Sequence, residues 1–271
     1  MTGALVAYRW ELRKLVAQKR TYIGLGAAAL LPVVFVTVMA LQKGGPYDAP
    51  LGHNLRRTGL ALALVVLNFV SRFGAQLAAA LVAGDIVASE HAGKTLKMIL
   101  TRSLRRGQIL TGKTLASFTY VVATILVLGA TGIVAGSAAW GFNPLTNLSG
   151  VRVSALHTLW LSAAAFGVFS LPLIAVAAFA ILLSTLTRNS AGSIVGTLVY
   201  ALGQEAVAGL VNQGWAKHYL LSDQFDGWHG LFMSPIDWTL IARAAWVSAI
   251  FAAVPLALAY GIFKSRDVAD D

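Results

Sequence analysis

Residues 158–186 read TLWLSAAAFGVFSLPLIAVAAFAILLSTL and contain no Asp, Glu, Lys or Arg. A helix of about 20 apolar residues is long enough to cross the roughly 30 Å hydrocarbon core of a bilayer. The stretch is rich in Ala and Leu and lacks the alternation of apolar and polar residues typical of a half-buried strand. A helix also satisfies its own backbone hydrogen bonds in lipid. We therefore predict that this segment is a membrane-spanning helix, with Pro172 inside it.

Five further stretches share this length and apolar character. Together they predict an all-α membrane protein with six transmembrane helices in a single transmembrane domain, 1–271. The predicted spans are about 22–41, 59–87, 115–140, 158–186, 191–211 and 240–263. A cleaved signal peptide is not predicted, because charged residues punctuate the first 20 positions and the next apolar run is too long for a signal peptide.

The composition supports the same class. Hydrophobic residues make up 57% of the chain and charged residues only 12%, whereas soluble domains carry roughly 25% charge. Most of the surface must therefore face lipid. The net charge of +10 would suggest nucleic acid binding in a soluble protein, but here it reflects the placement of loops, and no nucleic acid partner is predicted. The absence of Cys excludes disulfides and thiolate metal sites.

The positions of Lys and Arg predict the orientation. With the N-terminus in the cytoplasm, fourteen of the 21 Lys and Arg residues lie in internal segments and six in external ones, while Arg72 lies within the second span. Cytoplasmic loops carry the excess of Lys and Arg in membrane proteins. Both termini are therefore predicted to be cytoplasmic, and the external loop 212–239, rich in Trp, Tyr and Phe, is predicted to be interfacial or re-entrant.

The N-terminal segment 1–21 has two faces at helical spacing. Apolar residues lie on one face and cations on the other; they are Leu5, Tyr8, Leu12, Leu15 and Val16, and Arg9, Arg13 and Lys14. This pattern indicates an amphipathic helix on the inner leaflet, where cations meet anionic lipid. The alternative is a basic flank that only sets the topology.

The longest internal loop, 88–114, reads ASEHAGKTLKMILTRSLRRGQILTGKT. Leu96, Ile99 and Leu100 make a short apolar stripe that cations surround. A short amphipathic helix followed by a basic turn is suited to docking a cytosolic partner. The alternative is a surface loop that only obeys the positive-inside bias.

This loop resembles the cytoplasmic loop between helices two and three of ABC-2 type transporter permeases. The matching elements, in order, are Glu90, Thr95-Leu96-Lys97, Ile99-Leu100, Thr101-Arg102, Arg105-Arg106 and Ile109-Leu110-Thr111-Gly112-Lys113. The sequence departs from the family pattern at Lys94, where Gly is usual and Gly93 stands one position early, and at Ser103, where Pro is common.

Three other segments extend the resemblance over nearly the whole chain. The entry that begins at Trp10 is similar to the family's N-terminal elbow helix, 183–191 to its turn between helices four and five, and 263–267 to its exit after helix six. Each motif is degenerate alone, so the order and spacing carry the specificity.

The resemblance implies a permease subunit of an ATP-binding cassette transporter in the cytoplasmic (inner) membrane of a prokaryote. Members of that family are mostly exporters. A second permease subunit, identical or homologous, would complete the pathway. Two ATPase subunits holding ATP and magnesium would dock on the coupling helix, residues 90–100. This chain itself would hold no cofactor. The residues implied in docking are Glu90, Gly93, Thr95, Leu96, Ile99, Leu100, Arg102, Arg105 and Arg106.

Residues 107–114, GQILTGKT, fit the phosphate-binding P-loop pattern. That loop needs a buried strand before it and a helix N-terminus at the phosphate. Here basic residues precede the match and a predicted span follows it. We interpret the match as coincidence, and predict that ATP hydrolysis occurs in a partner and that this chain is not an enzyme.

Asn68, Arg72 and Gln76 are spaced four residues apart, so a continuous helix would place them on one face. An intramembrane charge is costly and faces protein or water. The face could line a translocation pathway or join helices structurally. Asp85 and Glu205, near predicted span ends, are interpreted as interfacial charges.

Three alternatives to the permease remain. An ion-coupled secondary transporter would need acids at mid-membrane, where the sequence predicts only Arg72. A membrane-embedded enzyme would need a catalytic cluster, which the sequence does not suggest. A non-transporting sensor or assembly subunit stays open.

Four His residues lie in segments predicted to be external, and they lack the tight spacing that would predict a metal site. They are His53, His157, His218 and His229.

Overall fold

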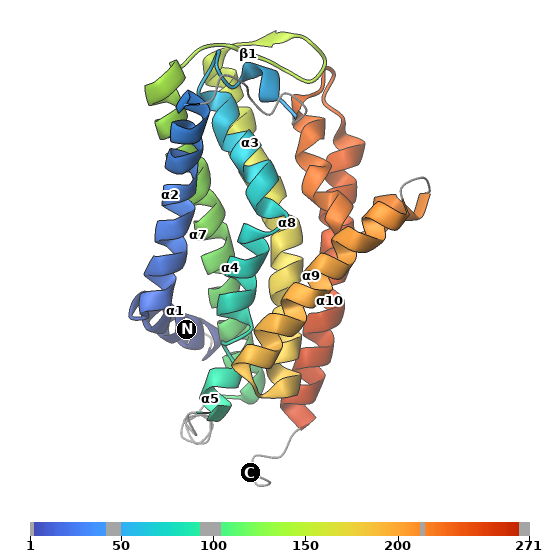
Figure 1. Ribbon diagram of the computed structural model, residues 1–271. Coiled ribbons are helices and arrows are strands. Elements are labelled where there is room, and N and C mark those ends of the chain that lie inside the picture. The colour runs from blue at the N-terminus through green and yellow to red at the C-terminus, as the bar shows by residue number, and fades with distance from the viewer. Residues whose placement is uncertain (1–2, 42–49, 93–103, 212–214, 266–271) are drawn as a thin grey trace.

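The computed structural model describes residues 3–41, 50–92, 104–211 and 215–265, and it is a bundle of long helices (Figure 1). The helix α1 (Gly3–Val16) lies across one end of the bundle, the end at which α10 (Trp238–Ser265) also finishes. The short strands β1 (Leu145–Thr146) and β2 (Arg152–Val153) pair antiparallel at the opposite end.

A single helix occupies five of the six predicted spans, α10 being the last of them. α2 spans Lys19–Leu41, α7 Arg106–Trp140, α8 Ala155–Thr187 and α9 Ser190–Leu210. Two of them begin with a side-chain cap, because Ser154 accepts a hydrogen bond from the amide of His157 and Asn189 accepts one from the amide of Gly192. α7 begins nine residues before the predicted span, so the last third of the predicted loop 88–114 is helix.

The predicted single helix 59–87 is instead broken, which corrects the sequence analysis. It forms α3 (Leu60–Ser71) and α4 (Gly74–Ala83), followed by the short α5 (Ala88–Ala92). The helix direction bends by 60° between α3 and the arm that begins with α4. Phe73 has φ −136° and ψ −61°, outside the helical region. The break lies near the mid-height of the bundle (Figure 1).

The predicted external loop 212–239 contains two 3-10 helices, η2 (Trp215–Tyr219) and η3 (Ser222–Phe232). A further short one, η1 (Gly52–Asn54), precedes α3. η3 packs against α8 and α10 and buries Phe225, Trp228 and Phe232. Trp228 is fully buried, and its ring stacks on Phe169 of α8 at a centroid distance of 5.5 Å.

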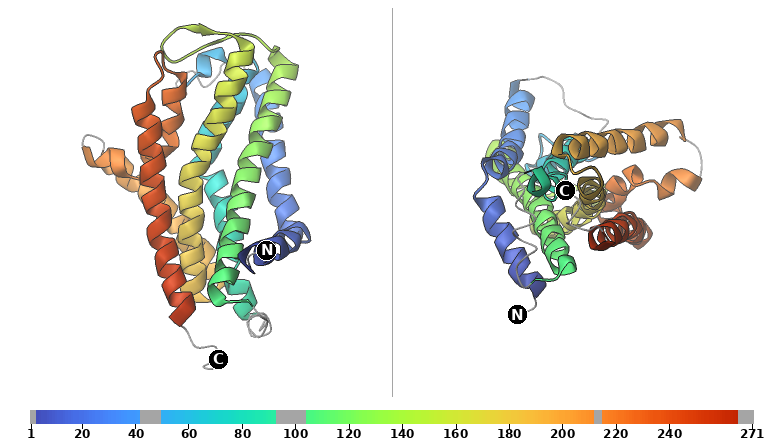
Figure 2. Two further views of the ribbon diagram at one scale, coloured as in Figure 1. Left: turned by 180° about the vertical axis from the view of Figure 1, so that it is seen from behind. Right: turned by 90° about the horizontal axis from the view of Figure 1, so that it is seen from below.

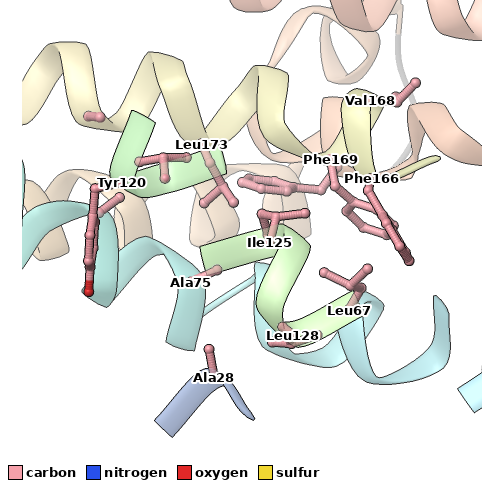
Figure 3. Packing of buried hydrophobic residues seen from close by; sticks show 14 of the residues in the cluster. Ala28, Leu67, Ala75, Tyr120, Ile125, Leu128, Phe166, Val168, Phe169 and Leu173 are labelled. Carbon is pink, nitrogen blue, oxygen red and sulfur yellow. The ribbon is translucent and has the colours of Figure 1, made fainter. Parts of the chain in front are cut away.

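The apolar core lies where α3, α7 and α8 meet. Figure 3 shows Leu67 of α3 facing Ile125 and Leu128 of α7, with Phe166 and Phe169 of α8 closing the cluster. α8 is the central helix, since 72% of its most apolar stretch is buried, against 17% for α9. In Figures 1 and 2 the C-terminal end of α9 stands out from the bundle.

Glycines set the distance between α3 and α7. A Cβ on Gly59 would overlap the backbone of Gly136, and one on Gly132 would come within 2.9 Å of the Cα of Ala63. Small residues allow such close approach between membrane helices. On α9, a Cβ on Gly196 would come within 2.9 Å of Cδ1 of Leu183 on α8, whereas one on Gly192 would meet only Asn189, at 3.8 Å.

Five described helices, α2, α7, α8, α9 and α10, are long and apolar enough to cross a membrane. The bent pair that begins with α3 makes six if it counts as one span. The chain is therefore an all-α protein whose helices have the length and composition of a multi-pass membrane protein.

Candidate functional site

Two networks of charged side chains hold segments far apart in the sequence, and the first centres on Lys113. Its side chain is 0% exposed. The ammonium lies 2.8 Å from a carboxylate oxygen of Glu11, 2.7 Å from one of Glu90, and 3.0 Å from the carbonyl oxygen of Ile86. Glu90 also accepts a hydrogen bond from Lys14 at 2.6 Å. A buried charge is costly unless it is paired and hydrogen-bonded, and two cations here meet two carboxylates.

This network joins three elements. Glu11 and Lys14 come from α1, Glu90 from α5 and Lys113 from the second turn of α7. Close backbone packing accompanies the charges, because a Cβ on Gly112 would come within 2.7 Å of the amide nitrogen of Tyr8. α1 is thus held against the bundle by a buried ion-pair network and by direct helix contact.

A second ion pair lies beside the first network. Arg20, at the start of α2, pairs with Asp85 in the segment between α4 and α5. An open cavity of about 500 Å³ separates the two sets of charges, and Lys14, Gln18, Lys19, Arg20, Asp85, Ser89 and Glu90 line it. Asp85, interpreted from the sequence as an interfacial charge, therefore pairs with the start of α2.

The predicted docking residues divide into three groups. Gly93, Thr95, Leu96, Ile99, Leu100 and Arg102 lie outside the described residues. Arg105 is exposed and precedes α7, and Arg106 donates to the carbonyl oxygen of Lys264 at 3.4 Å. Glu90 differs from the prediction: it is only 2% exposed, because its carboxylate neutralises Lys113 and Lys14 inside the chain.

Residues 107–114, which match the P-loop pattern, are helical from end to end within α7. A helix does not present a loop of free amides to phosphate. The Lys of the pattern, Lys113, is occupied by Glu11 and Glu90, and its Gly112 permits the packing of α1. Gly112 and Lys113 thus have contacts that differ from those of a phosphate-binding loop.

The second network centres on Arg72, at the break between α3 and α4. Its guanidinium donates to Glu205 of α9 at 3.2 Å and to both carboxylate oxygens of Asp226 in η3, at 3.0 and 2.9 Å. Glu205, which the sequence suggested as an interfacial charge, is thus half of an ion pair with Arg72. Both contacts with Asp226 come from one guanidinium nitrogen, Nη2, while Nη1 donates to Glu205, so Arg72 joins the two acids.

The bend also separates the three residues predicted to share a face. Asn68 lies in the last turns of α3 and Gln76 in the first turn of α4, with Arg72 between the arms. Gln76 is buried and lines a small cavity together with Glu205. The prediction of one continuous polar face is therefore wrong, although Arg72 and Gln76 both turn toward α9.

In the described part of the chain, no three His, Asp or Glu side chains lie close enough together to hold a metal ion. Two of the His residues that the sequence predicts to be external have different contacts. His218 Nδ1 is 3.3 Å from a carboxylate oxygen of Asp223, and the ring of His229 lies 4.5 Å from that of Trp228.

A family model described as "Protein of unknown function (DUF2705)" matches residues 29–269. The chain belongs to the DUF2705 family. No curated protein matches the sequence. The DUF2705 region covers Arg72, Lys113, Glu205 and Asp226, whereas Glu11 and the rest of α1 precede it.

In this DUF2705 protein the sequence analysis missed the pairing of Lys113 with Glu11 and the place of Asp226 beside Arg72. A signal for the first was present. Glu11 stands four residues from both Ala7 and Leu15, and all three are buried on one face of α1. A carboxylate on the packed face of a helix needs a cation from another segment.

Proposed function

We propose that this protein is a permease subunit of an ABC-2 type transporter. Its six spans would count the bent pair as one, α1 would be the elbow helix, and residues 90–100 would be the coupling helix. ATP would be bound and hydrolysed by partner subunits, and a second permease subunit would complete the pathway. The resemblance in residues 88–113 is the basis of the proposal. The buried Lys113 network is the single structural observation that supports it.

The network supports coupling because of where its members lie. Glu90 is close to the start of the predicted docking segment, Lys113 is at the start of α7, and Glu11 is on α1. A force applied by a partner between residues 93 and 103 would reach α1 and α7 through short charged contacts of 2.7 and 2.8 Å. Packed helices move as rigid elements, so such contacts can carry movement into a bundle.

The surface beside the network is suited to an acidic partner. Arg105 is exposed at the start of α7, and Arg106 lies next to it against the end of α10. The charges of this surface are positive, as expected for a cytoplasmic face. The partner would therefore contact Arg105 and Arg106 directly, while Glu90 would act from inside the chain.

The test is a detergent pull-down of this chain from its native membrane, with identification of the proteins that copurify. Recovery of a soluble ABC ATPase in an equal amount would support the permease. A sample that elutes intact from a sizing column but carries no ATPase would contradict it. The same preparation from cells that express an Arg105→Glu, Arg106→Glu variant provides the matched control for specific docking.

An ion-coupled secondary transporter is a second candidate, and one observation favours it. The sequence predicted Arg72 without acids near it, whereas Glu205 and Asp226 both pair with Arg72. Chains of acids in membrane segments serve as ion relays. Transport by the purified chain alone, driven by an ion gradient in vesicles without ATP, would favour this candidate over the permease.

A further inference from the structure

In the Arg72 network, one carboxylate oxygen has no hydrogen-bond donor among the described residues. Glu205 and Asp226 offer four carboxylate oxygens, and Arg72 donates to three of them. The fourth, Oε1 of Glu205, is buried and has no hydrogen-bond partner among the described residues. A buried acceptor without a donor is costly, so this atom is the point at which a ligand with one donor would bind.

The space beside Glu205 limits that ligand to a very small one. Gln76, Tyr200, Gln204 and Ser222 are among the residues that surround a cavity of about 10 Å³ next to Glu205. That volume holds about one water molecule. A metal ion is not indicated, because the described residues bring no third ligating side chain to the pair of acids. A proton, with or without one water, fits both the volume and the missing donor.

The charges around Glu205 favour the same ligand. Arg72 faces it from the bend between α3 and α4, and Asp226 and His229 face the network from η3. Farther along η3, Asp223 is shared by His218 and by Arg243 of α10. One guanidinium therefore meets two carboxylates, and a proton on Glu205 would make the group neutral while His229 is uncharged.

Glu205 also holds a weakly attached helix. Only 17% of the most apolar stretch of α9 is buried. Among the described residues, the polar contacts of its C-terminal half with the bundle are the ion pair of Glu205 with Arg72 and two hydrogen bonds of Gln204 with Leu221 and Ser222. Loss of the charge on Glu205 would remove the ionic contact and leave the two weaker ones.

We propose that Glu205 is a proton-binding site, and that its protonation releases Arg72 and lets the C-terminal end of α9 move away from the bend between α3 and α4. The proton comes from water and forms an O–H bond on a Glu205 oxygen, with no other bond made or broken. Arg72 keeps its ion pair with Asp226, made through Nη2. The site would make the conformation of the bundle respond to pH whichever energy source drives transport.

The experiment measures the distance between α9 and the bundle in the purified chain, without any partner. The chain has no Cys, so Val134→Cys on α7 and Leu210→Cys on α9, both exposed, can carry spin labels without background. The distance between the two labels is measured by pulsed electron–electron double resonance in lipid nanodiscs at pH 5 and pH 8. A label pair at Val134 and Leu258, on α7 and α10, is the control that should not change.

We expect the distance from Val134 to Leu210 to lengthen at pH 5 and the control distance to stay the same. Glu205→Gln should give the pH 5 distance at both pH values, and Arg72→Gln should do the same because it removes the other half of the pair. His229→Gln should keep the transition. An unchanged wild-type distance would overturn the proposal, and so would a transition that persists in Glu205→Gln or disappears in His229→Gln.

The wild-type measurement decides the proposal even if the variants do not fold. It also separates this proposal from the permease. A missing ATPase partner would contradict the permease while leaving the pH response of α9 untouched, and a constant α9 distance would contradict the proton site while leaving the partner untouched.

Discussion

The ammonium of Lys113 lies 2.8 Å from a carboxylate oxygen of Glu11, although the two residues are 102 positions apart in the sequence. The contact fastens the N-terminal helix α1 to the start of α7, and Glu90 completes it from α5. Because the Lys113 side chain has no exposure, its charge depends wholly on these partners. The pair therefore gives the clearest test of how the N-terminal helix is held.

Replacing Lys113 by Met should destabilise the protein by about 3 kcal/mol, because removal of one member of a buried pair leaves the opposite charge uncompensated. Thermal unfolding in detergent measures the effect. Lys264→Met is the matched control, since Lys264 is exposed, and it should change the stability by less than about 0.5 kcal/mol.

A second substitution tests whether the pair itself causes the loss. Adding Glu11→Gln to Lys113→Met restores the charge balance, with Lys14 left to neutralise Glu90. The double variant should then lose less than the sum of the two single variants. Strict additivity of the two losses would show that Lys113 and Glu11 do not interact.

Reversing both Arg105 and Arg106 to Glu should abolish copurification of the ATPase partner that we propose, because the docking surface would change from basic to acidic. Insertion into the membrane should be unaffected, as judged by expression and by resistance to alkaline extraction. Arg57→Glu is the control, because Arg57 is exposed and its carbonyl oxygen accepts a hydrogen bond from Asn143, just beyond the opposite end of α7. Full recovery of the partner with the reversed pair would contradict docking at this surface.

Replacing Gly59 by Ala should loosen the contact between α3 and α7, because the added Cβ would overlap the backbone of Gly136 and neither backbone can yield without shifting a helix. We expect a loss of about 1–3 kcal/mol, as for overpacked cores. The control is Gly203→Ala on α9, where a Cβ has nothing within 4 Å. Equal stability of the two variants would show that α3 and α7 are not held at this distance.

Protonating Asp237 should weaken the start of α10. Its carboxylate accepts hydrogen bonds from the amide and the hydroxyl of Thr239, at 2.9 and 2.5 Å, and these bonds lower the pKa of Asp237. A lowered pKa stabilises the fold above the unfolded-state value of roughly 3.9, and this stabilisation is lost as pH falls from there through the folded-state pKa.

The measurement compares the melting temperatures of the wild type and Asp237→Ala at several pH values. The wild type should melt higher at pH 6, and the difference should shrink as pH falls below about 4. Asp237→Asn keeps an uncharged capping group and should show less pH dependence than the wild type. A difference that stays constant down to pH 3 would contradict the role of the carboxylate.

Much of the fold could be predicted from local composition. The helices follow from long apolar runs such as 158–186, where α8 (Ala155–Thr187) extends the prediction by only a few residues. Length and apolar content are properties of a single segment. Lipid or a packed interior stabilises a long apolar helix wherever its segment lies in the sequence. The predicted interfacial or re-entrant character of 212–239 likewise rests on local aromatic content.

The candidate site was less predictable. Residues 88–113 carried a motif that sequence alone could compare with a family, and Arg105 is exposed as a docking role requires. Glu90 belongs to the same motif but is buried, and no local feature distinguishes it from an exposed Glu. Its burial depends on Lys113, which comes to it only when α5 and α7 pack together.

The sequence by itself determined that this protein is a set of apolar helices with a basic loop at 88–114, because hydropathy and helical spacing act within one segment. Only the tertiary structure decided that the second helix bends at Arg72, that Arg72 meets Asp226 from 154 positions away, and that Lys113 is enclosed by Glu11 and Glu90. These pairings depend on which helix faces touch, and a charge in an apolar bundle is stable only where that packing supplies its opposite.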